Sequence, residues 1–135
     1  MGREKTFQQF KMAQAQMTTS VPKSPNGEFN RGLFSCTEDC GTCVLACCCS
    51  CVVYGQNQQA AFNKEGCFGD ALVYCLLAGC YCTPCYAASG RGNIRGIRGI
   101  IGGFFGDCCA HLCCSPCALT QEKHEADIIS GKASA

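Results

Sequence analysis

The chain has 135 residues, 17 of which are cysteines; it contains no tryptophan, and its formal net charge is only +1. This length allows one compact domain with a tail, and so small a net charge argues against binding nucleic acid through bulk electrostatics. The cysteine content exceeds the roughly 8–10% that marks a cysteine framework. Such a framework means disulfides in a secreted chain and metal or redox chemistry in a cytosolic one.

The N-terminal residues contain no apolar run long enough for a secretory signal, so we expect the chain to lie on the reducing side. Most thiols should then be free or metal-bound, and 17 cysteines cannot all pair within one chain. Residues 21–32 hold two prolines and two glycines among polar side chains, which is typical of a linker. We therefore expect a flexible tail and linker over residues 1–32, a cysteine-rich domain over 33–125 and a C-terminal tail over 126–135.

The first cysteine-rich segment predicts a helix with sulfur along one face. Five cysteines follow one another at steps of 4, 3, 4 and 4 residues: Cys36, Cys40, Cys43, Cys47 and Cys51. Residues at these steps share one side of an α-helix. Glu38 and Asp39 suit its N-terminus, so we expect a helix from about Glu38 through Asn63, stopped at Gly66.

The segment from Ala71 to Ala88 has 18 residues and no charge. As a helix it would span about 27 Å, against a hydrocarbon core of about 30 Å. Gly79 and Pro84 weaken it as a straight rod. A buried core helix also fits, but a short chain has few surfaces to cover such a helix, so we favour full or partial membrane insertion.

Residues 90–107 combine arginines with many glycines. Arg91, Arg95 and Arg98 share one helical face, and three pairs of glycines lie four residues apart: Gly92/Gly96, Gly99/Gly103 and Gly102/Gly106. Such pairs let helices approach closely. We expect a helix at a membrane interface with its guanidinium groups at the lipid headgroups; a flexible glycine-rich loop is the alternative.

The second cysteine-rich segment lies within residues 107–125, where a turn is expected at Ser115-Pro116. Thiolates are soft ligands that favour zinc, cadmium and Cu(I), and Cys-x2-Cys pairs supply zinc sites well. The predicted metal ligands from both segments are Cys40, Cys43, Cys47, Cys51, Cys108, Cys109, His111, Cys113, Cys114 and Cys117. Two alternatives stay open: the cysteines pack helices as small apolar residues, or they pair as disulfides between the two segments.

Two stretches resemble the placenta-specific 8 family, a cysteine-rich family that includes onzin, cornifelin and the plant cadmium-resistance and cell-number-regulator proteins. The stretches are Cys47-Cys48-Cys49-Ser50-Cys51 with Gly55-Gln56, and Cys113-Cys114-Ser115-Pro116-Cys117 through Gln121. The resemblance covers about residues 32–125. Ser50 replaces the proline of the family's Cys-Pro-Cys, and Thr120 replaces its last cysteine, which places a four-sulfur site drawn from the closing motif in doubt.

The resemblance implies membrane association, and for plant members it implies transport or tolerance of zinc, cadmium or calcium and control of cell number. We therefore expect a mainly α, small cysteine-rich domain with one apolar hairpin or membrane-associated segment and a disordered N-terminal tail. Its expected role is handling divalent cations at the plasma membrane, as a homo-oligomer, with a cytosolic N-terminus, zinc as the candidate metal and no catalytic reaction. The alternatives are a metal-free structural or adaptor protein and, third, a thiol oxidoreductase.

Overall fold

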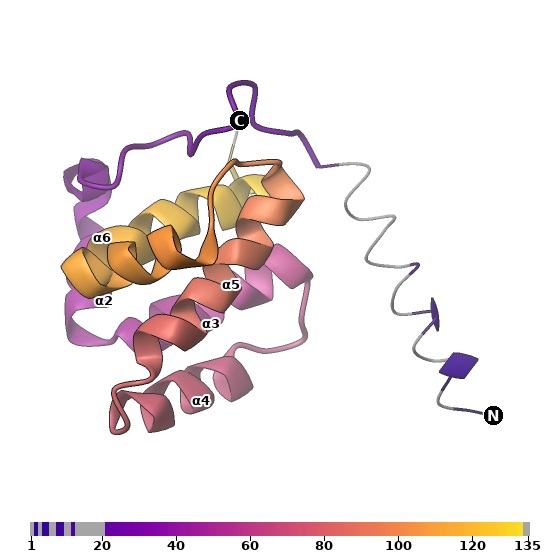
Figure 1. Ribbon diagram of the computed structural model, residues 1–135, viewed down its shortest axis with the longest axis horizontal. Helices are drawn as coiled ribbons and strands as arrows, with labels where there is room; N and C mark the ends of the chain where they lie inside the picture. Colours follow the sequence, from indigo (N-terminus) through magenta and orange to yellow (C-terminus); the bar gives the residue numbers. More distant parts are fainter. Residues whose placement is uncertain (1, 3, 6–7, 10–11, 13–20, 134–135) are drawn as a thin grey trace.

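The protein is a helical domain built around one long C-terminal helix (Figure 1). The computed structural model describes residues 2, 4–5, 8–9, 12 and 21–133, and in this part of the chain the elements are helices, with no strand. In chain order they are η1 (Ser35–Asp39), α2 (Cys40–Cys48), α3 (Ser50–Phe62), α4 (Phe68–Ala78), α5 (Thr83–Arg98) and α6 (Phe104–Ile129). The prediction of a mainly α, cysteine-rich domain is confirmed. Much of the predicted N-terminal tail lies outside the described residues.

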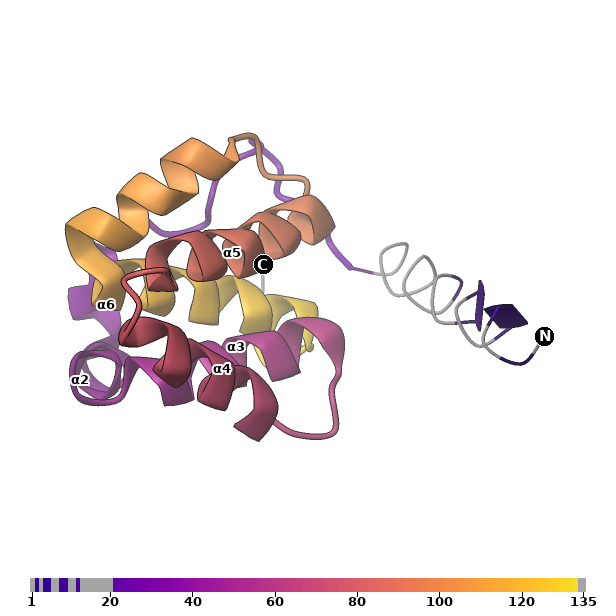
Figure 2. The same ribbon diagram turned by 60° about the horizontal axis from the view of Figure 1, so that its bottom comes forward.

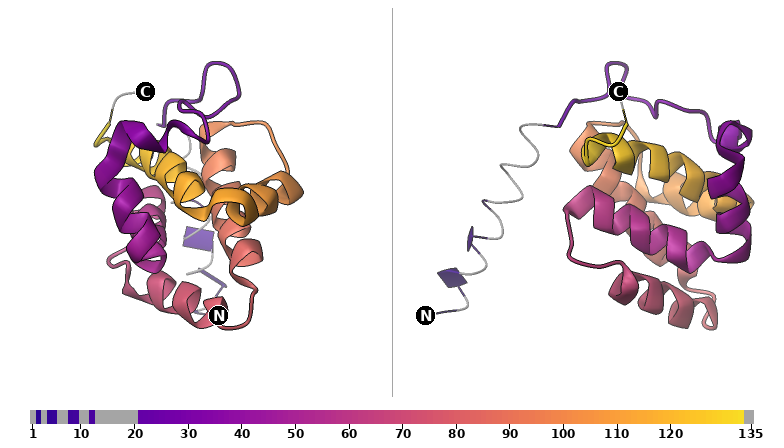
Figure 3. Two further views of the ribbon diagram at one scale, coloured as in Figure 1. Left: turned by 90° about the vertical axis from the view of Figure 1, so that its left-hand side faces the viewer. Right: turned by 180° about the vertical axis from the view of Figure 1, so that it is seen from behind.

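The helices are layered, with α6, α3 and α4 lying one above the other and α2 crossing their ends (Figure 3, right). Helix α6 packs against α5, α3 and α2, while α4 packs on the outer side of α3. Figure 2 shows α4 on the outside of the molecule. One side of this apolar helix is therefore left without a helical neighbour.

The first cysteine-rich segment is bent rather than continuous. The helix expected from Glu38 to Asn63 breaks at Cys49, and the axes on the two sides differ by 118°. Asp39 caps α2 by accepting a hydrogen bond from Thr42 N at 3.1 Å, as the acidic start of the segment led us to expect. Helix α3 then ends at Phe62 because Asn63 adopts the left-handed conformation, before the predicted stop at Gly66.

The apolar segment Ala71–Ala88 is also divided between two helices. Helix α4 ends at Ala78 and α5 begins at Thr83, so the expected 18-residue helix does not form. Pro84 lies in the first turn of α5, where its missing N–H leaves no hydrogen bond unmade. In the described part of the chain no single helix has the length and apolar character to cross a membrane, although the bent pair of Ser35–Cys48 and Ser50–Phe62 meets those criteria jointly.

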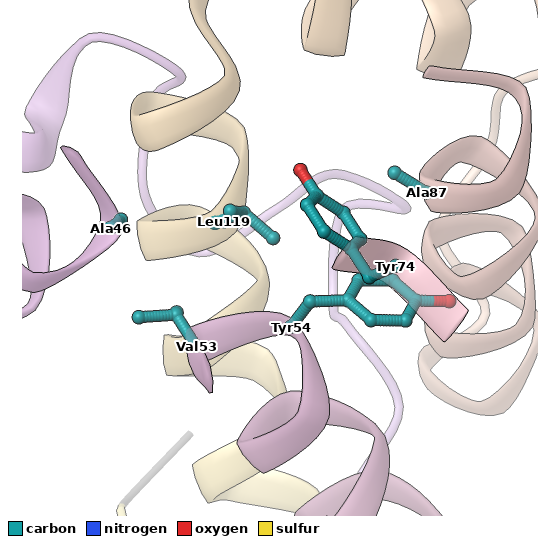
Figure 4. Close-up of a cluster of buried hydrophobic side chains, with 6 residues drawn as sticks. All are labelled: Ala46, Val53, Tyr54, Tyr74, Ala87 and Leu119. Atoms are coloured by element: carbon teal, nitrogen blue, oxygen red, sulfur yellow. The ribbon is translucent and has the colours of Figure 1, made fainter. Parts of the chain in front are cut away.

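Five helices contribute to the hydrophobic core shown in Figure 4. Its buried members are Ala46, Val53, Tyr54, Tyr74, Ala87 and Leu119. The rings of Tyr54 and Tyr74 lie 4.9 Å apart between centroids, in a tilted arrangement that suits the quadrupoles of aromatic rings. Leu119 lies between these rings and the smaller side chains of α2 and α3 (Figure 4). The core thus joins both cysteine-rich segments through α6.

The glycines that allow close packing differ from the three predicted pairs. A side chain at Gly90 of α5 would collide with Tyr54 and Gln58 of α3. Open space surrounds Gly96, which belongs to one of those pairs. Gly99 has a φ of 69° and ends α5, so the glycine-rich stretch supplies a helix end and a loop instead of a continuous glycine ridge.

Candidate functional site

Sulfur atoms from both cysteine-rich segments meet where η1 and α2 pack against α6. The Sγ atoms of Cys36 and Cys117 lie 3.4 Å apart although the residues are 81 positions apart in sequence. Cys114 and Cys117 are joined by a disulfide within α6. The thiols of Cys36 and Cys47 lie near enough to Cys43 to raise its pKa. We call these five residues, Cys36, Cys43, Cys47, Cys114 and Cys117, the sulfur cluster.

The kink in α6 places the disulfide. Pro116 has no N–H and its ring crowds the preceding helical turn, and Cys114 has non-helical angles of φ −152° and ψ 85°. The kink brings Cys114 and Cys117 together, but as a disulfide within the second segment, whereas their spacing predicted a pair of metal ligands and the disulfides considered were between the two segments. It also separates Cys117 from Cys113, which is exposed, although the two were expected one turn apart on a shared face.

The break at Cys49 has a matching effect on the first segment. Cys43 is half-buried and Cys47 is exposed on α2, whereas Cys51 lies beyond the bend and packs against the tyrosine core. The stripe of five sulfurs expected along one face is therefore divided. Cys40 is exposed, and its thiol donates to the carbonyl of Thr37 at 3.1 Å.

Burial and neighbouring thiols keep the thiol of Cys43 protonated. Burial, and after it the neighbouring thiols of Cys36 and Cys47, raises the pKa of Cys43 to about 11. At neutral pH this thiol is uncharged, so a metal ion must displace its proton in order to bind sulfur. Among the described residues, no group of three or more His, Cys, Asp or Glu side chains forms a metal-ligating arrangement. The disulfide occupies two of the cluster's five sulfurs.

The structure does not bring the predicted C-terminal ligands together around His111. The imidazole Nε2 of His111 lies 2.8 Å from a carboxylate oxygen of Glu122, and both side chains are buried. Cys108 and Cys109 are half-buried, and the thiol of Cys108 points to the carbonyl of Pro84 at 3.8 Å. Burial, followed by Cys85, raises the pKa of Cys108. His111 therefore contacts Glu122, a member of the ion-pair network that joins α5 to α6.

The three arginines that we placed at lipid headgroups lie between α5 and α6. Arg91 is 4% exposed and Arg98 is fully buried. Arg95 and Arg91 both bind Asp107, at 2.6 Å and 3.2 Å. The other buried partners on α6 are Glu122 for Arg91 and Glu125 for Arg98, at 3.3 Å and 2.6 Å. The three arginines share one face of α5, as predicted. This face packs against α6 because α6 supplies carboxylates that pair with the arginines.

The segment expected as a flexible linker covers one end of this network (Figure 1). The backbone N–H of Asn30 donates to Glu125 at 2.7 Å, and the side chain of Gln121 donates to the carbonyl of Arg31 at 2.6 Å. The ring of Phe29 lies 4.1 Å from the Arg91 guanidinium carbon, a cation–π contact. At the C-terminal end of the sequence, α6 continues to Ile129 and buries Ala126, within the stretch expected as a tail. The acidic side chains of α6, at helical spacing opposite three arginines, are the signal that sequence reasoning missed.

Fold and site together define a small cysteine-rich helical domain in which the two cysteine-rich segments contact each other where η1 and α2 pack against α6. The chain belongs to the PLAC8 family, the placenta-specific 8 family, whose sequence profile matches residues 29–125. Cell number regulator 9 of Zea mays is 36% identical over 102 residues, which are 73% of this chain and 58% of that protein. Protein Plant Cadmium Resistance 1 of Arabidopsis thaliana is 34% identical over 101 residues, 73% of this chain and 67% of the relative.

A further maize relative, Cell number regulator 7, is 33% identical over 117 residues, 79% of this chain and 65% of the relative. The chain thus spans about three fifths of the length of these two maize relatives. No solved structure matches the chain. The family assignment therefore rests on sequence, and it confirms the resemblance identified from the cysteine motifs.

Proposed function

We propose that the protein binds thiophilic divalent cations, zinc or cadmium, through the sulfur cluster, and so buffers or passes on these ions at a membrane surface. The observation that carries the proposal is the 3.4 Å approach of Cys36 to Cys117, which brings sulfur atoms of the two segments to one place. Similarity to two Arabidopsis proteins named for cadmium resistance supports it. The proposed role is binding and transfer, without catalysis.

The chemistry of the donor set fits such ions. Thiolates are soft ligands that favour zinc and cadmium over magnesium or calcium, and zinc takes four nitrogen or sulfur ligands. The reduced cluster would offer five sulfurs from two helical regions. Because two sulfurs are joined in the disulfide, reduction must precede binding. Cys43 and Cys47 on α2 would then complete a site with Cys36 and the α6 cysteines.

Membrane association is the second part of the proposal, and the outer side of α4 supports it. Four large apolar side chains are exposed there: Phe68, Leu72, Val73 and Leu76. An exposed apolar patch of this kind marks an interaction surface, and an apolar helix lying in the headgroup region would bury it. The alternative route is the bent pair of η1–α2 and α3, which also exposes Val44. We also propose a homo-oligomer, in which exposed apolar side chains of neighbouring copies contact one another at the membrane surface.

The metal proposal is tested by elemental analysis of protein purified under reducing conditions. We expect one or two zinc or cadmium ions per chain, on the order of one ion per four ligands, and a cadmium–thiolate absorption on titration. Cys117→Ser and Cys117→Ala should both weaken the tight site, because Cys117 is the α6 sulfur in contact with Cys36, whereas Cys48→Ser, at an exposed position outside the cluster, should retain it. Reduced protein that keeps its helices and binds no metal would rule out this function.

A structural or adaptor protein without metal is the second candidate, because buried ion pairs already join two of the helices. They hold α5 against α6 without a metal ion, while the disulfide closes a short loop within α6. In that case Cys117 only packs, and Cys117→Ala should be milder than Cys117→Ser, because serine buries a hydroxyl that needs a partner. Equal loss from both substitutions favours metal ligation.

A further inference from the structure

The members of the sulfur cluster can be ordered as a line by their exposure, from the buried Cys117 to the exposed Cys47. Cys117 is 6% exposed, Cys36 and Cys43 are half-buried, and Cys47 is exposed. Consecutive members are neighbours: Cys36 lies 3.4 Å from Cys117, and the thiols of Cys36 and Cys47 are near enough to Cys43 to raise its pKa. At one end of this line the sulfur is already in the disulfide with Cys114.

We propose that this line is a disulfide relay, in which Cys36 attacks Cys117 and the disulfide then moves through Cys43 toward the surface. Reacting atoms about 3–3.5 Å apart are in a near-attack position, and the Cys36–Cys117 separation falls in that range. The buried sulfur of Cys117 is shielded from thiols in solution. Its neighbour Cys36 reaches it from inside the domain.

The exchange is balanced without an external oxidant or reductant. The Cys36 thiol gives its proton to solvent, and its sulfur forms a bond to the Sγ of Cys117. The bond between Cys117 and Cys114 breaks, and its electron pair leaves on Cys114, which takes up a proton. In the second step Cys43 attacks Cys36 in the same way and releases reduced Cys117. One disulfide is present before and after each step.

The relay would control metal binding at the sulfur cluster. This effect on metal binding rests on the proposed function. A disulfide removes two of the five cluster sulfurs and leaves three, one fewer than the four ligands that zinc takes. A disulfide carried to the surface can be reduced by a small thiol of the glutathione class, which restores all five sulfurs. Oxidation would therefore release the ion, and reduction would allow it to bind again.

The relay is tested on metal-free full-length protein in the presence of a chelator. The protein is fully reduced, oxidised with one equivalent of an azodicarboxamide, quenched with acid and N-ethylmaleimide, and analysed by tandem mass spectrometry. We expect both Cys114–Cys117 and Cys36–Cys117 links in the wild type. In Cys114→Ser the Cys36–Cys117 link should predominate, while Cys113→Ser, an exposed neighbour, should match the wild type. A Cys114→Ser protein of native helix content in which neither a Cys36–Cys117 nor a Cys36–Cys43 link forms would overturn the relay.

A second measurement does not depend on the folding of Cys114→Ser. Glutathione should reduce the Cys114–Cys117 disulfide at least tenfold more slowly in Cys36→Ser than in the wild type, and an unchanged rate would overturn the proposal. Zinc affinity is measured separately on reduced and singly oxidised wild type, and we expect at least a tenfold loss on oxidation. Exchange without zinc binding to reduced protein would refute the proposed function and leave the relay standing. Zinc binding without a Cys36–Cys117 or Cys36–Cys43 link would refute the relay alone.

Discussion

Cys43 lies between the thiols of Cys36 and Cys47, and this position makes the stability of the reduced protein depend on pH. Burial and these neighbours raise its pKa from 9.0 to about 11. Between these values the folded chain keeps the proton that the unfolded chain has lost. The stability contributed by neutral Cys43 is therefore complete below pH 9 and lost as pH rises through 11.

We predict that the free energy of unfolding of reduced, metal-free protein falls between pH 9 and 11, and that Cys43→Ala makes this fall shallower. Urea unfolding in a phosphine reductant at several pH values measures it. Cys48→Ala, which changes an exposed thiol outside the cluster, should keep the full pH dependence. Identical slopes in Cys43→Ala and the wild type would contradict this assignment.

At the scale of the helices, the pairing of α5 with α6 depends on buried charges. The ion pair of Arg98 with Glu125 is fully buried on both sides, at 2.6 Å. Removing one partner leaves an uncompensated buried charge, which costs about 3–5 kcal/mol. We predict a loss of that size for Glu125→Gln, whose amide oxygen can still accept from Asn30, measured by urea unfolding.

The matched control is Lys123→Met on the same helix. Lys123 pairs with Asp127 four residues later, and both side chains are 23% exposed. Such pairs contribute about 0.3–0.5 kcal/mol, so the control should change stability little. A Glu125→Gln protein as stable as this control would show that the buried network does not hold α5 on α6.

Helix α4 allows a test of membrane association that does not disturb the core. Leu76 is 66% exposed, so Leu76→Asp should leave the fold intact while removing an apolar side chain worth about 1.5–3 kcal/mol of burial. We predict about a tenfold or greater loss of binding to lipid vesicles in a flotation assay, since 1.4 kcal/mol corresponds to a factor of ten.

Val44→Asp on α2 is the control for the alternative membrane segment. Val44 is 62% exposed, close to the value for Leu76. If α4 makes the contact, Val44→Asp should bind vesicles as the wild type does. Loss of binding in Val44→Asp alone would show that the bent pair of η1–α2 and α3 contacts the membrane. Wild-type protein that fails to bind vesicles would refute membrane association by either surface.

For the whole molecule, local patterns predicted the helices, the two cysteine-rich segments and the shared face of the arginines. They did not predict what those features meet, because that depends on packing. The break at Cys49 and the kink at Cys114 decide which cysteines converge. The turn expected at Ser115-Pro116 lies beside this kink, whereas the spacing of the cysteines does not mark the break at Cys49. The sequence predicted that the arginine face contacts a membrane. In the folded chain Glu122 and Glu125 of α6 pack against this face instead.

The N-terminal segment, residues 21–31, contributes to the stability of the helical domain. Residues 21–31 satisfy buried groups on α5 and α6, among them Glu125 and Gln121, and Pro22 accepts from Arg98. A buried polar group left without a partner costs about 1–3 kcal/mol. We predict that a chain starting at Gly32 is less stable by about 3 kcal/mol or more than one starting at Val21, by urea unfolding. Equal stability of the two chains would mean that solvent replaces these contacts without loss.

The most direct test of metal binding by the sulfur cluster is a competition titration of reduced protein with zinc against a chromogenic chelator. The wild type, Cys117→Ser and Cys48→Ser are compared at one pH. Binding through the cluster predicts that Cys117→Ser lowers zinc affinity by more than about tenfold, or about 1.4 kcal/mol, since it removes the α6 sulfur in contact with Cys36, while Cys48→Ser leaves the affinity unchanged. Equal affinities in all three proteins, or a loss confined to Cys48→Ser, would contradict it.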